Sequence, residues 1–153
     1  MVKLDKTDLK ILQILQKEAR ITTKAMAEKL NLSVTPVFER VKRLEREGVI
    51  DGYVALLNQS KIDRKLIVFI SISLKEHTRT YLEKFIDEMK SFPEVMECYH
   101  IAGNFDFLLK VVMKDMESYQ AFILSKLSVI SNIGHVQSSF VLSKSKFTTA
   151  YTL

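Results

Sequence analysis

The sequence predicts an α+β protein with two domains, a bundle of three short helices followed by a βαββαβ domain. Apolar residues recur at helical spacing before the polar stretch 58–61, and after it β-rich runs alternate with helical patterns. The chain has 153 residues, 47% of them apolar, with only four Gly and two Pro, so it can bury a core. We expect one domain at residues 1–60, a linker to about residue 65, and a second domain at residues 66–153.

The first two helices are predicted from capping residues and apolar stripes. Asp5 lies three residues before Asp8, and apolar residues repeat at helical spacing from there to residue 19. Thr22 is a good N-cap for a second, short helix. Asn31 tolerates the left-handed conformation that ends a helix, so we expect this helix to end there.

The third helix has the clearest local signals. Ser33 is its expected N-cap, Pro36 lies in its first turn, and Gly48 ends it. Its inner face is expected to carry Val37, Val41 and Leu44. Its opposite side is expected to carry Thr35, Glu39, Arg40, Arg43 and Arg46. Residues 49–54 are expected to turn and form a short strand beside the helices, a wing.

Strands and helices alternate after the linker. Strands are expected at residues 66–74, 95–101, 107–113 and about 136–142. One helix is expected before Pro93, and another over residues 119–130. The turn at residues 102–104 makes the second and third strands a hairpin. This order is that of a ferredoxin-like domain.

The basic residues of the first domain gather on its third helix. The whole chain has a net charge of +5, but residues 1–60 hold 11 basic and 8 acidic residues, so the total says little. Three short helices with a basic third helix are typical of a winged helix-turn-helix, which places that helix in the major groove of double-stranded DNA. The alternative is a solvated face stabilised by pairs such as Glu39 with Arg43. The candidate DNA contacts are Thr22, Ser33, Thr35, Pro36, Glu39, Arg40, Lys42, Arg43 and Arg46.

Several motifs occur in the order and spacing seen in the Lrp/AsnC family. They are Leu4-Asp5-x-x-Asp8-x-x-Ile11-Leu12, Ala19-Arg20-Ile21-Thr22, Ala27-x-x-Leu30-x-Leu32-Ser33, Arg40-Val41-x-x-Leu44-Glu45-x-x-Gly48-Val49-Ile50 and Gly103-x-x-Asp106. Over nearly its whole length the chain resembles these leucine-responsive, or feast/famine, transcription regulators. The resemblance implies a sequence-specific regulator that responds to a small amino-acid effector. It also implies homodimers, formed through the sheet, that assemble into higher oligomers, often octamers. Asp63 stands where the family often has glycine.

An effector site is predicted at residues 103–106, where the hairpin turns. Glycine lets a ligand approach the backbone, turn N–H groups can receive an α-carboxylate, and Asp106 can hold an α-ammonium. The alternative is ordinary turn chemistry in which Asp106 caps the loop. The resemblance adds polar residues of the last strand and places the ligand at the contact between dimers. The candidate effector residues are Tyr99, Ile101, Gly103, Asn104, Asp106, Gln137, Ser138 and Ser139, of which Tyr99 and Ile101 are equally candidates for the sheet core.

No motif typical of catalysis or of cofactor binding occurs in the sequence. The histidines show no metal-ligand spacing with Cys98, although His100 and His135 can meet if their strands are neighbours. Some relatives with this layout resemble tetrapyrrole-precursor decarboxylases, but the second domain has few arginines to hold several carboxylates. We expect a regulator and not an enzyme, with no catalytic residue, metal or cofactor. An architectural protein that wraps DNA with little sequence preference is a further alternative.

The composition also predicts a compartment. A single cysteine cannot form an intrachain disulfide, and the first eight residues are too charged for a signal peptide. The longest apolar run, residues 66–74, is much shorter than a membrane span of about 18 residues. We expect a cytoplasmic protein without a membrane partner.

Overall fold

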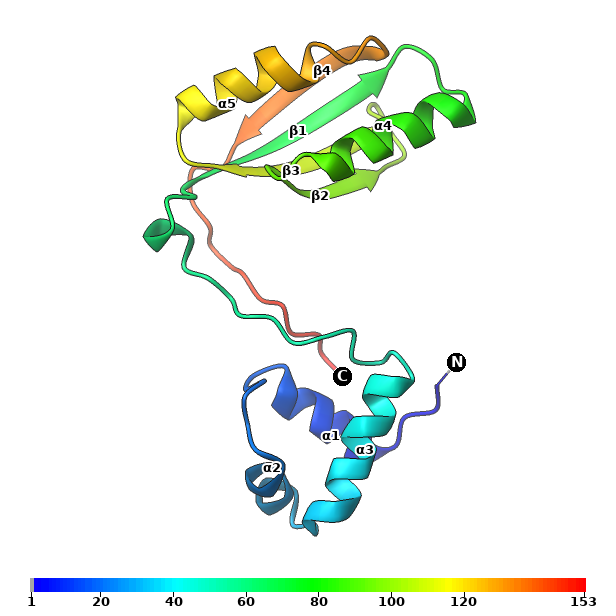
Figure 1. Ribbon diagram of the computed structural model, residues 1–153, viewed down its shortest axis with the longest axis vertical. Helices are drawn as coiled ribbons and strands as arrows, with labels where there is room; N and C mark the ends of the chain where they lie inside the picture. Colours follow the sequence, from blue (N-terminus) through cyan, green and yellow to red (C-terminus); the bar gives the residue numbers. More distant parts are fainter. Residues whose placement is uncertain (1) are drawn as a thin grey trace. The chain divides into compact units, whose positions relative to one another are not determined.

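The computed structural model describes residues 2–153 as two compact units (Figure 1). The first unit comprises residues 2–56 and 146–153, and the second comprises residues 57–145. The division near residue 56 lies a few residues before the expected boundary at 60. The last eight residues group with the first unit, although the sequence predicts that they belong to the second domain. No helix within residues 2–153 has both the length and the apolar character needed to span a membrane.

Capping residues fix the first helices of the first unit. In α1 (Lys6–Leu15) the Asp5 carboxylate accepts from the N–H groups of Thr7 and Asp8, and the Asp8 carboxylate accepts from the Asp5 N–H at 3.0 Å. This reciprocal pair is a capping box. In α2 (Thr23–Leu30) the Thr22 hydroxyl accepts from the Ala25 N–H at 3.2 Å, and Asn31 ends the helix with φ of 53°. The predicted caps are therefore confirmed.

The third helix, α3 (Val34–Arg46), packs against the first two. Ser33 occupies its N-cap position but makes no capping hydrogen bond, and Gly48 takes a left-handed φ of 67° just beyond its end. Glycine suits that position because it lacks a Cβ atom. Val37 and Leu44 are buried, as predicted for the inner face. The core of the unit consists of Ile11, Leu12, Met26, Ala27, Val37 and Leu44.

The short strand expected at residues 49–54 is wrong. The structure assigns no strand there, and Val54 is 81% exposed. Val49 and Ile50 pack against the helical core, and the Tyr53 hydroxyl donates to Glu45 at 3.0 Å. A strand needs a partner for its backbone groups, and no strand of residues 2–56 offers one.

The last eight residues pack on α1. The Gln16 side-chain amide pairs with both backbone groups of Tyr151, accepting from its N–H at 2.6 Å and donating to its carbonyl at 3.2 Å. Gln13 donates to the carbonyl of Leu153 at 3.1 Å. Residues 146–153 are therefore held to the first unit by side chains that bind backbone.

The second unit contains a four-stranded antiparallel sheet of order β2-β3-β1-β4. The strands are β1 (Leu66–Leu74), β2 (Val95–His100), β3 (Phe107–Met113) and β4 (Ile133–Phe140). β4 begins three residues before its predicted start and ends two residues early, whereas the first three strands match within one residue. The antiparallel βαββαβ order confirms the ferredoxin-like prediction.

Two helices cover one face of this sheet (Figure 1). They are α4 (Arg79–Ser91) and α5 (Met116–Phe122), the latter continuing into a π-helical turn at Ile123–Leu127. Val68, Ile70 and Ile72 of β1 are buried beneath them, because alternate residues of a strand point to opposite faces. Residues 69, 71 and 73 lie on the other face, which no helix of the unit covers.

Candidate DNA-binding surface and effector site

The candidate DNA contacts on α3 fall on two different sides of the helix. Successive residues of an α-helix are rotated by about 100°, so Arg40, three residues after buried Val37, lies only about 60° from it. Arg40 therefore belongs to the flank of α3. The sequence-based prediction that it lies on the side opposite the core is wrong. The side opposite the core carries four residues, which we call the outer stripe: Thr35, Glu39, Lys42 and Arg46.

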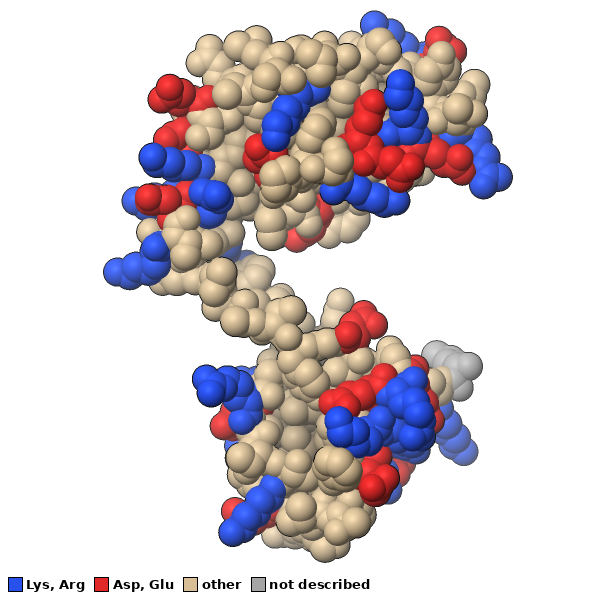
Figure 2. Space-filling model, viewed as in Figure 1, with Lys and Arg blue, Asp and Glu red and all other residues tan. Residues whose placement is uncertain are grey.

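The arginines on the flank bind carboxylates of the first helix. Nη1 of Arg40 donates to Asp5 Oδ2 at 2.6 Å and to Asp8 Oδ1 at 2.8 Å, and Nη2 of Arg43 donates to Asp8 Oδ2 at 2.6 Å. The Asp8 side chain is 1% exposed, and the two arginine side chains are about one-third exposed. On the first unit in Figure 2, basic and acidic side chains are interleaved and do not form a uniform basic face.

The ion pairs keep the Asp8 carboxylate ionised. Burial raises the pKa of Asp8, but the hydrogen bond from the Asp5 N–H and those from Arg40 and Arg43 outweigh burial, so this pKa lies below its ordinary value. The pKa of Asp5 is lowered in the same way, first by the Asp8 N–H and then by Arg40. The cluster therefore joins two negative and two positive charges and is neutral as a whole.

The other candidate DNA contacts are exposed. Thr35, Pro36 and Glu39 point to solvent at the N-terminal half of α3, and Arg46 does so near its end. Lys42 pairs with Glu45 at 2.8 Å and lies 5.8 Å from the centre of the Phe38 ring. Thr22 and Ser33 precede α2 and α3 and are also exposed, although the Thr22 hydroxyl already accepts a capping hydrogen bond.

The candidate effector loop, residues 103–106, is tied to the end of β1 by hydrogen bonds. Gly103 has a φ of 144°, a backbone conformation that residues other than glycine rarely adopt. Asp106 Oδ2 accepts from the Leu74 N–H at 2.7 Å and lies 2.9 Å from Nε2 of His77, while the Asp106 carbonyl accepts from the Ile101 N–H at 2.8 Å. Burial raises the pKa of Asp106. The hydrogen bonds from Leu74 and His77 lower it by more, so this pKa lies below its ordinary value. Sequence reasoning did not find these two partners, because nothing in their spacing points to Asp106.

The same loop also approaches β4. The Ser73 hydroxyl donates to the carbonyl of Asn104 at 3.3 Å, and the ring of Phe105 stacks on His135 with 5.9 Å between ring centres. Oδ1 of Asp106 has no hydrogen-bond partner within residues 2–153. Thus the loop has a fixed backbone and one carboxylate oxygen left to receive a donor.

The candidate residues of β4 lie on opposite faces of the sheet. Gln137 and Ser139 pair with Ser71 and Phe69 on the face that no helix covers. Ser138 faces the helices, where its hydroxyl accepts from the Tyr119 hydroxyl at 2.6 Å. The structure therefore separates Ser138 from its two neighbours.

Tyr99 and Gln137 lie at opposite edges of the same sheet. The register places them in one row, with Leu108 and Ser71 between them. Three strand spacings separate the two residues by about 14 Å, more than a small amino acid spans. The same strand order keeps His100 on β2 and His135 on β4 apart, so the suggested approach of these histidines is wrong. No metal-binding cluster occurs among residues 2–153.

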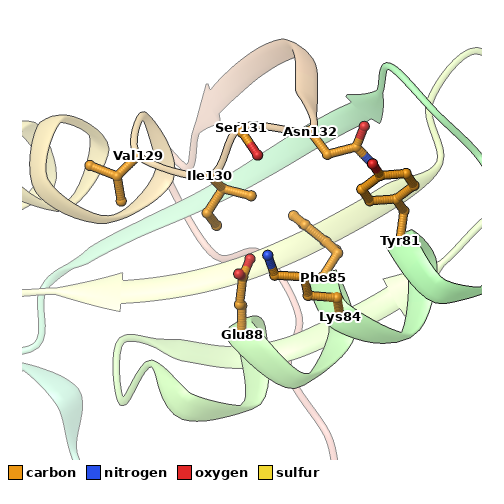
Figure 3. A pocket seen from close by; sticks show the side chains of 8 residues that line it. All are labelled: Tyr81, Lys84, Phe85, Glu88, Val129, Ile130, Ser131 and Asn132. Carbon is orange, nitrogen blue, oxygen red and sulfur yellow. The ribbon is translucent and has the colours of Figure 1, made fainter.

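A hollow lies between α4 and residues 129–132 (Figure 3). Its volume is about 70 Å³, and Lys84 and Glu88 of α4 lie along one side of it. Oε2 of Glu88 is buried without a hydrogen-bond partner in the described chain. None of the predicted effector residues lines this hollow.

Two sequence models of protein families match the chain. The Lrp/AsnC ligand-binding domain matches residues 67–151, and a winged helix-turn-helix DNA-binding domain matches residues 4–51. The chain belongs to the Lrp/AsnC family of transcription regulators. The predicted family and fold class are thus confirmed. The first unit is the winged helix-turn-helix domain even though its residues 49–54 form no strand.

Individual relatives of this Lrp/AsnC protein are transcription regulators. It is 39% identical to the Bkd operon transcriptional regulator of Pseudomonas aeruginosa over 142 residues, 93% of each chain. It is 36% identical to the leucine-responsive regulatory protein of Escherichia coli over 143 residues, 94% of this chain and 87% of that one. These relatives support a regulator over the decarboxylase alternative.

Two crystal structures with similar sequences share its fold. The complex of a transcriptional regulator with L-Met from Neisseria meningitidis superimposes with a TM-score of 0.94 at 36% identity, covering 98% of this chain and 97% of that one. An AsnC family transcriptional regulator from Agrobacterium tumefaciens gives a TM-score of 0.93 at 37% identity, covering 97% of each chain.

Proposed function

We propose that this regulator binds specific DNA sites through α3. We also propose that a small amino acid, bound at the loop 103–106, changes its assembly or its affinity for DNA. The single observation that carries the effector proposal is the free Oδ1 of Asp106 beside the open backbone of Gly103. A DNA-binding protein with one free cysteine fits the cytoplasm.

The exposed N-terminal half of α3 supports the proposed DNA contact. A recognition helix meets base edges with its N-terminal residues, where Thr35, Pro36 and Glu39 are exposed. Glu39 can accept from a cytosine amino group, and Arg46 near the helix end can bind a phosphate. Thr22 and Ser33 can donate hydroxyl hydrogen bonds to phosphate oxygens.

The chemistry of the loop supports an amino acid as the effector. The α-ammonium of an amino acid would donate to Oδ1 of Asp106, because a charge-assisted bond to a carboxylate is among the stronger hydrogen bonds. The α-carboxylate would bind N–H groups of the turn at Gly103 and Asn104, where no Cβ atom obstructs the glycine. The relative from Neisseria meningitidis was crystallised with such a ligand, L-Met.

The separation of Tyr99 from Gln137 supports a site shared between copies of the chain. One small ligand cannot contact both Tyr99 and Gln137 of one sheet, so one of these two edges would complete the site from another copy. The uncovered sheet face would form the dimer, and dimers would meet at the loops to build a higher oligomer, up to an octamer. In such a dimer the two α3 helices would read half-sites about 34 Å apart.

Two measurements test the proposal. Fluorescence anisotropy with the promoter region of its own gene and with random DNA should show tighter promoter binding that weakens steeply with salt. Equal affinity for both DNAs would instead favour architectural wrapping. Thermal unfolding with each of the twenty amino acids at millimolar concentration should reveal a stabilising ligand, because a ligand that binds the folded state raises its stability. Asp106→Asn should abolish that shift, and a shift of unchanged size would contradict the effector site.

A further inference from the structure

We propose that Asp8 is a positioning residue for DNA recognition, which holds α3 through Arg40 and Arg43 and leaves the contacts to DNA to the outer stripe. This inference rests on the proposed binding of DNA by α3. It removes Arg40 and Arg43 from the set of DNA-reading residues and gives a role to Asp8, a residue of α1.

The bonds around Asp8 are the first reason. Its carboxylate receives hydrogen bonds from the Asp5 N–H, Arg40 and Arg43, and its side chain is 1% exposed. A buried charge that loses its partners is strongly unfavourable. Neither arginine can therefore turn to a DNA phosphate without leaving part of the Asp8 carboxylate unpaired.

The charge of α3 is the second reason. Asp5 and Asp8 neutralise Arg40 and Arg43, and Glu45 pairs with Lys42 at 2.8 Å. Arg46 has no ion pair or hydrogen bond within residues 2–153. The basic cluster visible in the sequence is thus largely balanced by carboxylates in the fold, and Arg46 is the cation of α3 that a phosphate can neutralise at no cost to another pair.

The length of α3 explains why its orientation matters for DNA recognition. Thr35 and Arg46 lie eleven residues apart, which is about 16 Å along a helix. If α3 tilted by about 10°, one end of the outer stripe would move by about 3 Å relative to the other, which is the length of a hydrogen bond. Arg40 and Arg43 anchor the middle of the helix to α1 at two points, so they resist this tilt.

The test compares flank and stripe variants of the full-length protein. Binding to the promoter fragment and to random DNA is measured by anisotropy over a range of salt concentrations for Asp8→Asn, Arg40→Gln, Arg43→Gln, Glu39→Gln and Arg46→Gln. Removing one phosphate contact makes the negative slope of log K against log salt shallower by about one. We expect that change for Arg46→Gln alone. We expect Asp8→Asn, Arg40→Gln and Arg43→Gln to keep the slope and to lower the promoter preference by about tenfold.

Two controls keep the result interpretable. Every variant is measured at a temperature where circular dichroism shows it folded, and Asp5→Asn is the milder variant if Asp8→Asn does not fold. Asparagine still caps α1, but it no longer gives Arg40 a charged partner at that position, so a smaller loss of promoter preference at unchanged slope is expected.

A slope shallower by about one for Arg40→Gln or Arg43→Gln, with an unchanged promoter preference, would overturn the inference, because those arginines would then contact phosphates. Failure of the proposed function looks different. In that case the unsubstituted protein itself would bind promoter and random DNA equally, or would not respond to salt.

Discussion

Asp8 of α1 and Arg43 of α3 form an ion pair of 2.6 Å across the interface of these helices. Asp8 belongs at the same time to the capping box that begins α1. One carboxylate therefore both starts a helix and fixes the helix proposed to enter DNA. The arrangement couples the local stability of α1 to the position of α3, since any change at Asp8 acts on both.

Replacing Asp8 should destabilise the first unit. Asp8→Asn leaves Arg40 and Arg43 without their buried partner, and we expect a loss of about 2 to 3 kcal/mol in the free energy of unfolding. This is below the value for a fully buried pair, because both arginines are one-third exposed. Urea titration followed by circular dichroism measures the loss. The control Asp5→Asn, at a half-exposed site, should cost clearly less, and equal losses would contradict the central role of Asp8.

The same carboxylate should make stability depend on acid pH. The folded pKa of Asp8 lies below its ordinary value of 3.8, so its ion pairs contribute fully above that value. The contribution is lost as the pH falls from about 4 through the folded pKa. Urea midpoints measured from pH 6 down to pH 3 should therefore fall less steeply for Asp8→Asn than for the unsubstituted protein, because other carboxylates affect both. Parallel curves would exclude a lowered pKa at Asp8.

The last eight residues should protect α1. Gln16 needs both its donor and its acceptor to pair with Tyr151, and Gln16→Glu removes the donor. We expect faster hydrogen exchange of the α1 amides in that variant and in a chain ending at residue 145, corresponding to about 1 kcal/mol per lost hydrogen bond. Lys17→Gln, at the exposed position directly after Gln16, is the matched control and should leave exchange unchanged. Unaltered exchange after the truncation would show that residues 146–153 do not hold α1 in solution.

Substitutions in β4 should separate ligand binding from folding. Ser138→Ala and Tyr119→Phe both break the hydrogen bond of 2.6 Å under α5, so each should lower the free energy of unfolding by about 1 kcal/mol and keep the stabilising effect of the amino acid. Gln137→Ala and Ser139→Ala lie on the uncovered face and should reduce that effect, while neither breaks a side-chain hydrogen bond seen within residues 2–153. Thermal unfolding with and without ligand measures both quantities. The reverse pattern would place the ligand on the helix side of the sheet.

Much of the fold follows from local signals. The capping roles of Asp5 and Thr22, the left-handed Asn31 and the glycine after α3 were all readable, because each depends on a few neighbouring residues. The strands at residues 66–74 and 107–113 were readable because β-branched and apolar runs favour a buried sheet. The prediction of a strand at residues 49–54 is wrong, because its sequence favours an extended backbone but the fold supplies no partner strand.

The candidate DNA surface was readable only in part. Counting residues identified a basic third helix, and the rotation of 100° per residue would have put Arg40 near the core side. No sequence signal linked Arg40 and Arg43 to Asp8, thirty-two and thirty-five residues away. The effector loop shows the same limit, because Leu74 and His77 reach Asp106 only through the pairing of β1 with β3.

By itself, the sequence determined the two-domain α+β architecture, the Lrp/AsnC resemblance, the capped helices and the loop 103–106, because periodicity and capping act over a few residues. The tertiary structure decided which charges are free to meet DNA and which face of β4 each polar residue occupies. It also decided that residues 146–153 return to α1. These outcomes depend on contacts between distant segments, where burial and pairing set the energy of a charge. The sequence gives the number of charges on α3, whereas the structure shows which of them are paired with carboxylates of α1.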